Sequence, residues 1–171
     1  MRKNAIVTGG GSGIGRAMCL AFAESGYRVY CVDINVFAAI DLAEFSKLFR
    51  YTGEIIPACA DVAVDCWVRT MFSEGVCGTG NIDVLVNNAG IQPLASYAPI
   101  ERIEEEMWDR IFAVNVKGCY LVTKYCVHRM TAGSSIINIA SVTGLAAAKN
   151  NAAYGASKSA LIGLTKHMAL D

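Results

Sequence analysis

Five short apolar runs recur along the chain, and they constrain its fold more than any other feature of the sequence. They lie at residues 5–7, 28–33, 55–59, 82–86 and 135–139. Each is apolar almost throughout instead of alternating with polar residues, which is typical of strands buried on both faces of a parallel sheet. Helix-length stretches separate and follow these runs, roughly at residues 13–25, 36–49, 63–74, 101–131 and 152–170.

The alternation of strands and helices predicts an α/β fold, a doubly wound Rossmann-type parallel sheet with helices on both faces and right-handed crossovers. The expected strand order within this chain is 3-2-1-4-5. No Pro-rich linker, internal repeat or low-complexity segment divides the 171 residues, which are enough for one sizeable core. We therefore expect one domain over residues 1–171.

The overall composition argues against several classes of protein. Hydrophobic residues make up 54% of the chain and charged residues 18%, a globular balance and not a disordered one. Fifteen Lys and Arg offset fifteen Asp and Glu, so no basic excess points to nucleic acid or an anionic membrane. No apolar run is long enough to span a bilayer, and the N-terminus lacks a signal-peptide pattern. We expect a cytoplasmic protein.

The cysteines and histidines give no sign of a metal site. The seven cysteines are odd in number and form no Cys-x-x-Cys pair; they are Cys19, Cys31, Cys59, Cys66, Cys77, Cys119 and Cys126. Several lie in apolar patterns, so we interpret them as buried, reduced thiols, since a zinc site or catalytic Cys would need partners that the sequence does not offer. His128 and His167 are interpreted as helix-surface or interface residues.

A glycine-rich turn, Thr8-Gly9-Gly10-Gly11-Ser12-Gly13-Ile14-Gly15, joins the first apolar run to a helix. Glycines permit close approach of backbone N–H groups to phosphate oxygens, and a helix N-terminus carries about half a positive charge. The spacing Gly9-x-x-x-Gly13-x-Gly15 does not match Gly-x-Gly-x-x-Gly, and the absence of Gly-Lys-Ser/Thr excludes a P-loop. The turn predicts a nucleotide phosphate site, with Ser12 at the phosphate; a purely structural turn is the alternative.

Asp33 ends the second apolar run, eighteen residues after Gly15. A carboxylate there can accept both hydroxyls of an adenosine ribose and would repel a 2′-phosphate. Ile34 and Asn35 follow, so no adjacent cation offers a 2′-phosphate pocket. NAD(H) is therefore predicted in preference to NADP(H). The alternative for Asp33 is an ordinary strand-end carboxylate that caps the next helix.

Polar segments also follow the third and fourth apolar runs. Asp61-Val62 is a candidate for contact with adenine, and Asn87-Asn88-Ala89-Gly90 is a candidate lining of the cofactor path. Either segment could instead be a simple turn.

Tyr154 and Lys158 are four residues apart, and Ser141 precedes Tyr154 by thirteen. On a helix, residues i and i+4 lie on one face with Cβ atoms about 5–6 Å apart. A lysine ammonium beside a phenol favours the phenolate, which a tyrosine needs if it is to take a proton from an alcohol near neutral pH. Ser141 is a plausible hydrogen-bond donor to the same substrate oxygen. A Tyr-x-x-x-Lys spacing also arises by chance, from a core tyrosine and a solvated lysine.

Together these segments resemble the short-chain dehydrogenase/reductase family in its common one-domain form. The matching segments occur in the family's order along the whole chain: Thr8-Gly9-x-x-x-Gly13-Ile14-Gly15, Asp61-Val62, Asn87-Asn88-Ala89-Gly90, Asn115-Val116-Lys117-Gly118, Ser141 and Tyr154-x-x-x-Lys158. The resemblance implies an NAD(H)-dependent oxidoreductase that interconverts a small secondary alcohol and a ketone by hydride transfer.

The resemblance also implies a role for each site residue. Tyr154 would be the general acid/base, and Lys158 would promote its ionisation and bind the nicotinamide ribose. Ser141 would polarise the substrate oxygen, and Asn115 would hold a water of the proton relay. The residues expected to bind the cofactor are Gly9, Gly11, Ser12, Gly13, Ile14, Gly15, Asp33, Asp61, Val62, Asn88, Ala89, Gly90, Tyr154 and Lys158. Gln92, Leu94, Leu145 and residues 146–151 are expected to face the substrate.

The family pattern continues beyond Asp171 with a sixth strand, a Pro-Gly turn, a mobile substrate loop and a final strand. We therefore expect these 171 residues to be part of a longer functional subunit, with the fifth strand as an open edge and the substrate pocket without its lid. Helices at 113–131 and 154–170 are expected to form a four-helix bundle in a homodimer or homotetramer, unless they pack only on their own sheet. The alternatives to an enzyme are an NAD(H)-binding module or regulatory subunit without turnover, and a structural protein that has lost the cofactor.

Overall fold

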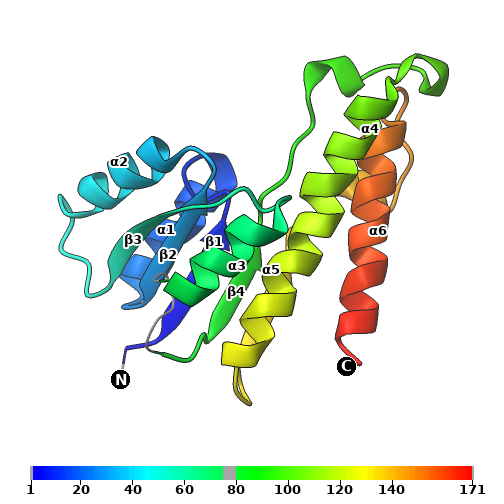
Figure 1. Cartoon of the computed structure of the whole chain (residues 1–171). Helices are drawn as coiled ribbons and strands as arrows, with labels where there is room; N and C mark the ends of the chain where they lie inside the picture. Colours follow the sequence, from blue (N-terminus) through cyan, green and yellow to red (C-terminus); the bar gives the residue numbers. More distant parts are fainter. Residues whose placement is uncertain (1, 75–79, 171) are drawn as a thin grey trace.

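A five-stranded parallel sheet forms the centre of the molecule, in a computed structural model that describes residues 2–74 and 80–170 (Figure 1). Its strand order is β3-β2-β1-β4-β5, which confirms the predicted topology. The strands are β1 (Asn4–Thr8), β2 (Arg28–Asp33), β3 (Glu54–Cys59), β4 (Val84–Asn87) and β5 (Ser135–Asn138).

Helices cover both faces of the sheet and follow the strands along the chain (Figure 1). They are α1 (Gly13–Glu24), α2 (Val36–Ser46), α3 (Asp65–Glu74), α4 (Glu105–Phe112), α5 (Gly118–Cys126) and α6 (Ala152–Met168). Apolar residues of α1 and α2 pack with Val7 on one face, and those of α3 and α5 pack with Ile6 on the other. Because neighbouring residues of β1 are buried on opposite faces, the strand has to be apolar throughout.

The chain between residues 101 and 131 is not the single helix that its sequence predicts. A short 3-10 turn covers Ile100–Arg102, and α4 begins only at Glu105, because Ile103 and Glu104 are extended with ψ angles of 116° and 143°. A π-helical turn, Ala113–Lys117, then joins α4 to α5. These helices form one long rod that lies beside α6 (Figure 1).

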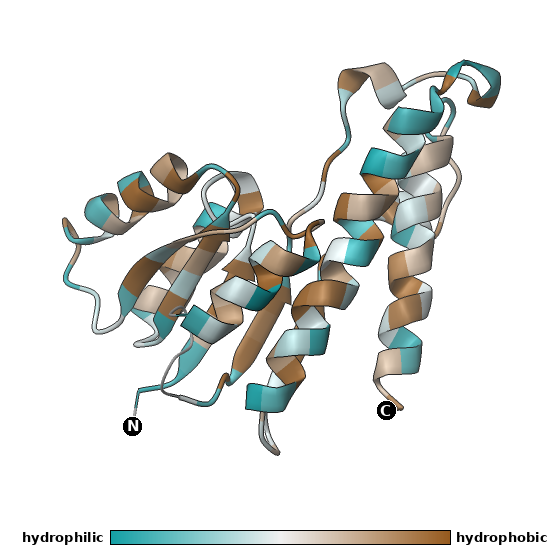
Figure 2. Ribbon diagram, in the orientation of Figure 1, coloured by the Kyte–Doolittle hydropathy of each residue, from teal (hydrophilic) through white to brown (hydrophobic). Residues whose placement is uncertain are grey.

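The sheet ends at β5, whose only partner among the described residues is β4. Ile137 on this strand is 43% exposed, in keeping with the predicted open edge. β4, by contrast, lies inside the sheet and is largely brown in Figure 2, as a strand buried on both faces should be.

The cysteine prediction is partly wrong. Cys19, Cys31, Cys119 and Cys126 are buried thiols, whereas Cys59 and Cys66 are exposed, because they lie at the end of the outer strand β3 and in the first turn of α3. Cys77 lies outside the described residues. His128 and His167 are exposed on helical turns near the ends of the α5 region and α6. Within residues 2–74 and 80–170, no helix combines the length and apolarity needed to cross a bilayer.

Candidate active site

The carboxyl ends of the strands open into a cleft of about 830 Å³. That volume lies within the range of small-molecule and cofactor sites. The predicted site residues that line it are Gly9, Ser12, Gly13, Ile14, Asp33, Asp61, Val62, Asn88, Ala89, Gly90, Ser141, Tyr154 and Lys158. Gly11, Gly15 and Asn115 are not among the lining residues.

The glycine-rich turn after β1 is held by the segment after β4. Asn88 Nδ2 donates to the carbonyls of Thr8 and Gly9 at 2.9 and 3.1 Å, and Thr8 Oγ1 accepts from the backbone N–H of Asn88 at 3.1 Å. Gly9 has a φ of +62°, and a Cβ on Gly15 would stand 2.1 Å from the Gly9 carbonyl oxygen. The first turn of α1 therefore approaches the loop so closely that only glycine fits at position 15.

Asp33 is oriented by two backbone donors. Its Oδ2 accepts from the N–H of Gly11 and its Oδ1 from the N–H of Asn35, each at 2.9 Å. Asn35, and not Asp33, is the N-cap of α2, because its own side chain accepts from Ala38 N at 3.3 Å. The Asp33 carboxylate is thus turned toward the glycine turn and the cleft, and the helix-capping alternative does not hold.

Asp61, just after β3, lines the same cleft as Asp33. Its Oδ1 accepts from the N–H of Ala63 at 2.9 Å, which fixes the turn that leads into α3. The segment is therefore a turn that also forms part of the cleft wall.

Tyr154 and Lys158 both belong to α6 and both face the cleft. The Lys158 Nζ lies 5.6 Å from the centre of the Tyr154 ring and donates to the Ile139 carbonyl at 2.7 Å. Lys158 is only 4% exposed. Burial lowers the pKa of its ammonium, because a charge removed from water is disfavoured.

Ser141 follows β5 and is fixed by Thr143. Its Oγ accepts from the Thr143 N–H at 3.2 Å and from the Thr143 hydroxyl at 2.9 Å. No described residue accepts the hydrogen of the Ser141 hydroxyl. Ser141 can therefore donate that hydrogen to a group in the cleft.

Asn115 occupies the π-helical turn and is 1% exposed. Its Oδ1 accepts from the Ile91 N–H at 2.8 Å, and its Nδ2 donates to the Ile91 carbonyl at 3.1 Å and to Ser157 Oγ at 3.0 Å. Ser157 in turn donates to the Tyr154 carbonyl at 2.7 Å. Asn115 thus joins the segment after β4 to the first turns of α6. A single-turn π-bulge is itself frequent at functional sites.

The cleft also has a wall that the sequence did not reveal. Arg110, Ala113 and Val114 line it from α4 and the π-helical turn. Their position a few residues before Asn115, on the same helical segment, could have indicated that they line the cleft. Gln92, which the sequence assigns to the substrate side, lines the cleft as well.

Comparison with known proteins assigns this chain to a family. The model of the short chain dehydrogenase family matches residues 3–171. An uncharacterized oxidoreductase of Thermotoga maritima is 39% identical over 171 residues, covering 99% of this chain and 65% of that protein. D-threitol dehydrogenase of Mycolicibacterium smegmatis is 35% identical, over 99% of this chain and 64% of its own length.

A solved structure shares the fold. A short chain dehydrogenase/reductase of Burkholderia phymatum, in complex with NAD, superposes with a TM-score of 0.86 at 26% identity, over 98% of this chain and 59% of that one. The chain spans about 65% of the length of the first curated relatives that it matches. The chain belongs to the short-chain dehydrogenase family.

Proposed function

We propose that this chain carries the active site of an NAD(H)-dependent oxidoreductase that interconverts a small secondary alcohol and a ketone by hydride transfer, with Tyr154 as general acid/base. One observation carries the proposal. The cleft that holds the glycine turn and Asp33 at one end also holds Ser141, Tyr154 and Lys158. A dinucleotide bound along that cleft would therefore reach from a ribose-binding carboxylate to a proton-transfer group.

The residues of the cleft fit NAD(H). The glycine turn, in which the first turn of α1 approaches Gly9 closely at Gly15, would place backbone N–H groups and Ser12 beside a pyrophosphate at the N-terminus of α1. Asp33, held by Gly11 and Asn35, would accept the hydroxyls of the adenosine ribose and repel a 2′-phosphate. The bound nicotinamide would supply the hydride chemistry, and the protein would supply position and charge.

The protein's part of the reaction is proton transfer to and from the substrate oxygen. In the reduction, the Tyr154 hydroxyl would give its proton to the oxygen while the Ser141 hydroxyl donates a hydrogen bond to it. Donors already in place stabilise the negative charge that develops there. The Lys158 ammonium, 5.6 Å from the ring centre, stabilises the phenolate left behind.

The space beside Gly90 suits a relay water. A Cβ placed on Gly90 would lie 3.4 Å from both Asn115 Oδ1 and Lys158 Nζ. The Asn115 Oδ1 has a second lone pair beyond the one used by Ile91, and the ammonium has donors beyond the one used by Ile139. A water in this space could link the two groups, which is the role we propose for Asn115.

We also propose that the protein is a homodimer or homotetramer of the cytoplasm. The face of α6 that carries Ala156, Ala160, Gly163 and Leu164 is only partly buried, and α6 itself lies beside α4 (Figure 1). The thiols among the described residues are free, as expected of a reducing compartment. Light scattering at micromolar concentration tests the assembly, and a monomer would contradict it.

The test of the catalytic proposal compares the wild type with Tyr154→Phe and with the control Tyr97→Phe, a tyrosine that is 51% exposed on a loop. NADH binding is measured by fluorescence titration, and turnover with a panel of ketones. We expect Tyr154→Phe to keep NADH binding and to lose about 10²-fold or more in kcat, the usual contribution of a general acid. Equal background rates of NADH oxidation in all three proteins would remove Tyr154 from catalysis and favour an NAD(H)-binding module without turnover. Lack of NADH binding would overturn the nucleotide site.

A further inference from the structure

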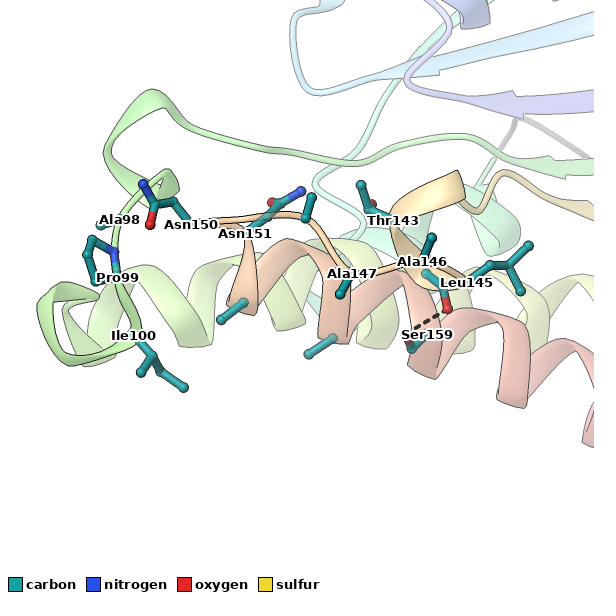
Figure 3. A pocket seen from close by; sticks show the side chains of 15 residues that line it. Ala98, Pro99, Ile100, Thr143, Leu145, Ala146, Ala147, Asn150, Asn151 and Ser159 are labelled. Carbon is teal, nitrogen blue, oxygen red and sulfur yellow. Dashed lines mark hydrogen bonds between the residues drawn. The ribbon is translucent and has the colours of Figure 1, made fainter.

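A hydrogen bond joins two amide side chains at the border between the large cleft and a second cavity. Gln92 Nε2 donates to Asn151 Oδ1 at 2.7 Å, across 59 positions of the sequence. Gln92 lines the cleft together with Ser141 and Tyr154. Asn151 lines the neighbouring cavity of about 350 Å³, where Figure 3 shows its side chain pointing away from α6.

The Asn151 side chain makes this contact instead of capping the first turn of α6. Asn151 is the N-cap of α6, but its side chain makes no capping bond. An asparagine at this position usually accepts from a backbone N–H of the first turn, a bond worth about 1 kcal/mol. Asn150 just before it has a φ of 58°, the one positive φ among the described non-glycine residues. Backbone of this kind is often found at ligand clamps.

Two of the pair's four polar atoms make no hydrogen bond with a described residue. Gln92 Oε1 can accept and Asn151 Nδ2 can donate twice, and no residue in the described ranges bonds either atom. Neither atom is fully enclosed, because Asn87 Oδ1 is the one buried side-chain N or O atom without a partner among the described residues. Both atoms can therefore reach a polar group that enters the cavity.

The chemistry of the two free atoms selects the partner. One hydroxyl can donate to Gln92 Oε1 and accept from Asn151 Nδ2 at the same time. A carboxylate could not donate to the first atom, and an ammonium could not accept from the second. The second cavity has no charged side chain in its lining, which includes Pro99, Leu145 and several alanines (Figure 3). The surroundings therefore suit a neutral, hydroxylated group.

We propose that Gln92 and Asn151 recognise a second hydroxyl of the substrate, so that the site prefers vicinal diols and the corresponding hydroxyketones to simple alcohols and ketones. Asn151 precedes Tyr154 by three residues, which puts it one helical turn from the group that handles the reacting oxygen. This inference rests on the proposed oxidoreductase function. It adds the class of substrate, which the proton-transfer residues do not define.

The kinetic test compares 2,3-butanediol with 2-butanol, which differ by one hydroxyl. We expect the wild type to show a kcat/KM at least about tenfold higher for the diol, the effect of one well-made hydrogen bond. Gln92→Leu and Asn151→Ala should each reduce that preference to within about threefold, through a higher KM for the diol. Tyr97→Phe, a 51% exposed residue of the same segment as Gln92 that lines neither the cleft nor the second cavity, should leave the preference unchanged. A wild type without preference, or variants that keep it, would overturn the pair's role.

A second measurement separates this inference from the proposed function. The side-chain NH₂ signals of Gln92 and Asn151, assigned by their loss in the two variants, are followed by NMR during titration with each alcohol, with and without NADH. Shifts with 2,3-butanediol but not with 2-butanol would support the pair even if no alcohol is turned over, in which case only the proposed function fails. No shift, or equal shifts with both alcohols, would overturn the pair whatever the activity.

Discussion

The backbone N–H of Gly11 donates to the Asp33 carboxylate at 2.9 Å, so the glycine turn itself holds the side chain expected to contact the ribose. A Cβ on Gly11 would lie 3.0 Å from the same Oδ2 and 2.8 Å from the Ala38 Cβ. The segments that we propose bind the phosphates and the ribose are therefore directly linked, and a shift of the turn would also move the carboxylate.

Asp33→Asn tests the origin of cofactor choice. The variant keeps an oxygen acceptor for the Gly11 N–H but loses the negative charge that would repel a 2′-phosphate. We expect the ratio of NADPH to NADH dissociation constants to fall at least about tenfold, measured by fluorescence titration. Asp41→Asn, at an exposed position of α2, is the control and should leave the ratio unchanged. An unchanged ratio in Asp33→Asn would remove Asp33 from cofactor discrimination.

Gly15→Ala tests the close approach of α1 to the turn. The added Cβ would stand 2.1 Å from the Gly9 carbonyl oxygen, and that backbone can yield only by moving the turn. We expect the free energy of unfolding to fall by about 1–3 kcal/mol, in urea titrations, and NADH binding to weaken.

Gly163→Ala is the matched control for that substitution, because no atom lies within 4 Å of its would-be Cβ inside α6. Within one subunit it should stabilise the fold by roughly 0.5–1 kcal/mol through helix propensity, and because Gly163 lies on the proposed assembly face, all proteins are compared at one concentration. Equal effects of the two alanines would show that the approach of Gly15 to Gly9 is not a constraint.

Ser157→Ala tests the link between Asn115 and α6. Ser157 is fully buried, and its loss removes the side-chain donor to the Tyr154 carbonyl and one of the two acceptors of Asn115 Nδ2. We expect a loss of about 1–3 kcal/mol in the free energy of unfolding and a lower kcat with little change in KM. Ser159→Ala, at an exposed position of the same helix, should change stability by no more than about 0.5 kcal/mol. A kcat unchanged in Ser157→Ala would limit the link to a structural role.

Lys158→Met tests the charge buried beside Tyr154. Burial lowers the pKa of Lys158 below its ordinary 10.5, so between the lowered value and 10.5 the unfolded chain binds more protons than the folded one. The stability of the wild type relative to Lys158→Met should therefore rise with pH across that window and be smallest at neutral pH. Urea titrations of both proteins from pH 7 to pH 10.5 measure the difference. A difference that is independent of pH would contradict the burial of a charged ammonium.

The sequence was most informative where burial decides the structure. The run 28–33 coincides with β2 because its interior residues are buried on both faces, and apolar continuity signals that directly. The break at Ile103 and Glu104 was missed because nothing in the pattern of 101–131 marks two extended residues. Local propensity does not determine such positions when tertiary contacts set the backbone.

The site was predicted as a set of residues but not as a set of contacts. The family resemblance singled out Asn115, yet its bonds to Ile91 and Ser157 depend on how distant segments meet. The same holds for Gln92 and Asn151, whose pairing spans the interval between β4 and α6. Periodicity describes one element at a time, and these contacts arise only between elements.

The dependence of α6 on side-chain and loop contacts has a consequence for local unfolding. The helix is bonded to the rest of the fold through Asn115–Ser157, Lys158–Ile139, Ser159–Gly144 and Asn138–Thr165. Amide hydrogens of α6 should therefore exchange with solvent before those of β1 and β2, in openings smaller than global unfolding. In each such opening the chain would keep Asp33 and the glycine turn, which we propose bind the nucleotide, while Tyr154, the proposed acid/base group, is displaced. Nucleotide affinity and chemical competence would then be separable properties of one molecule.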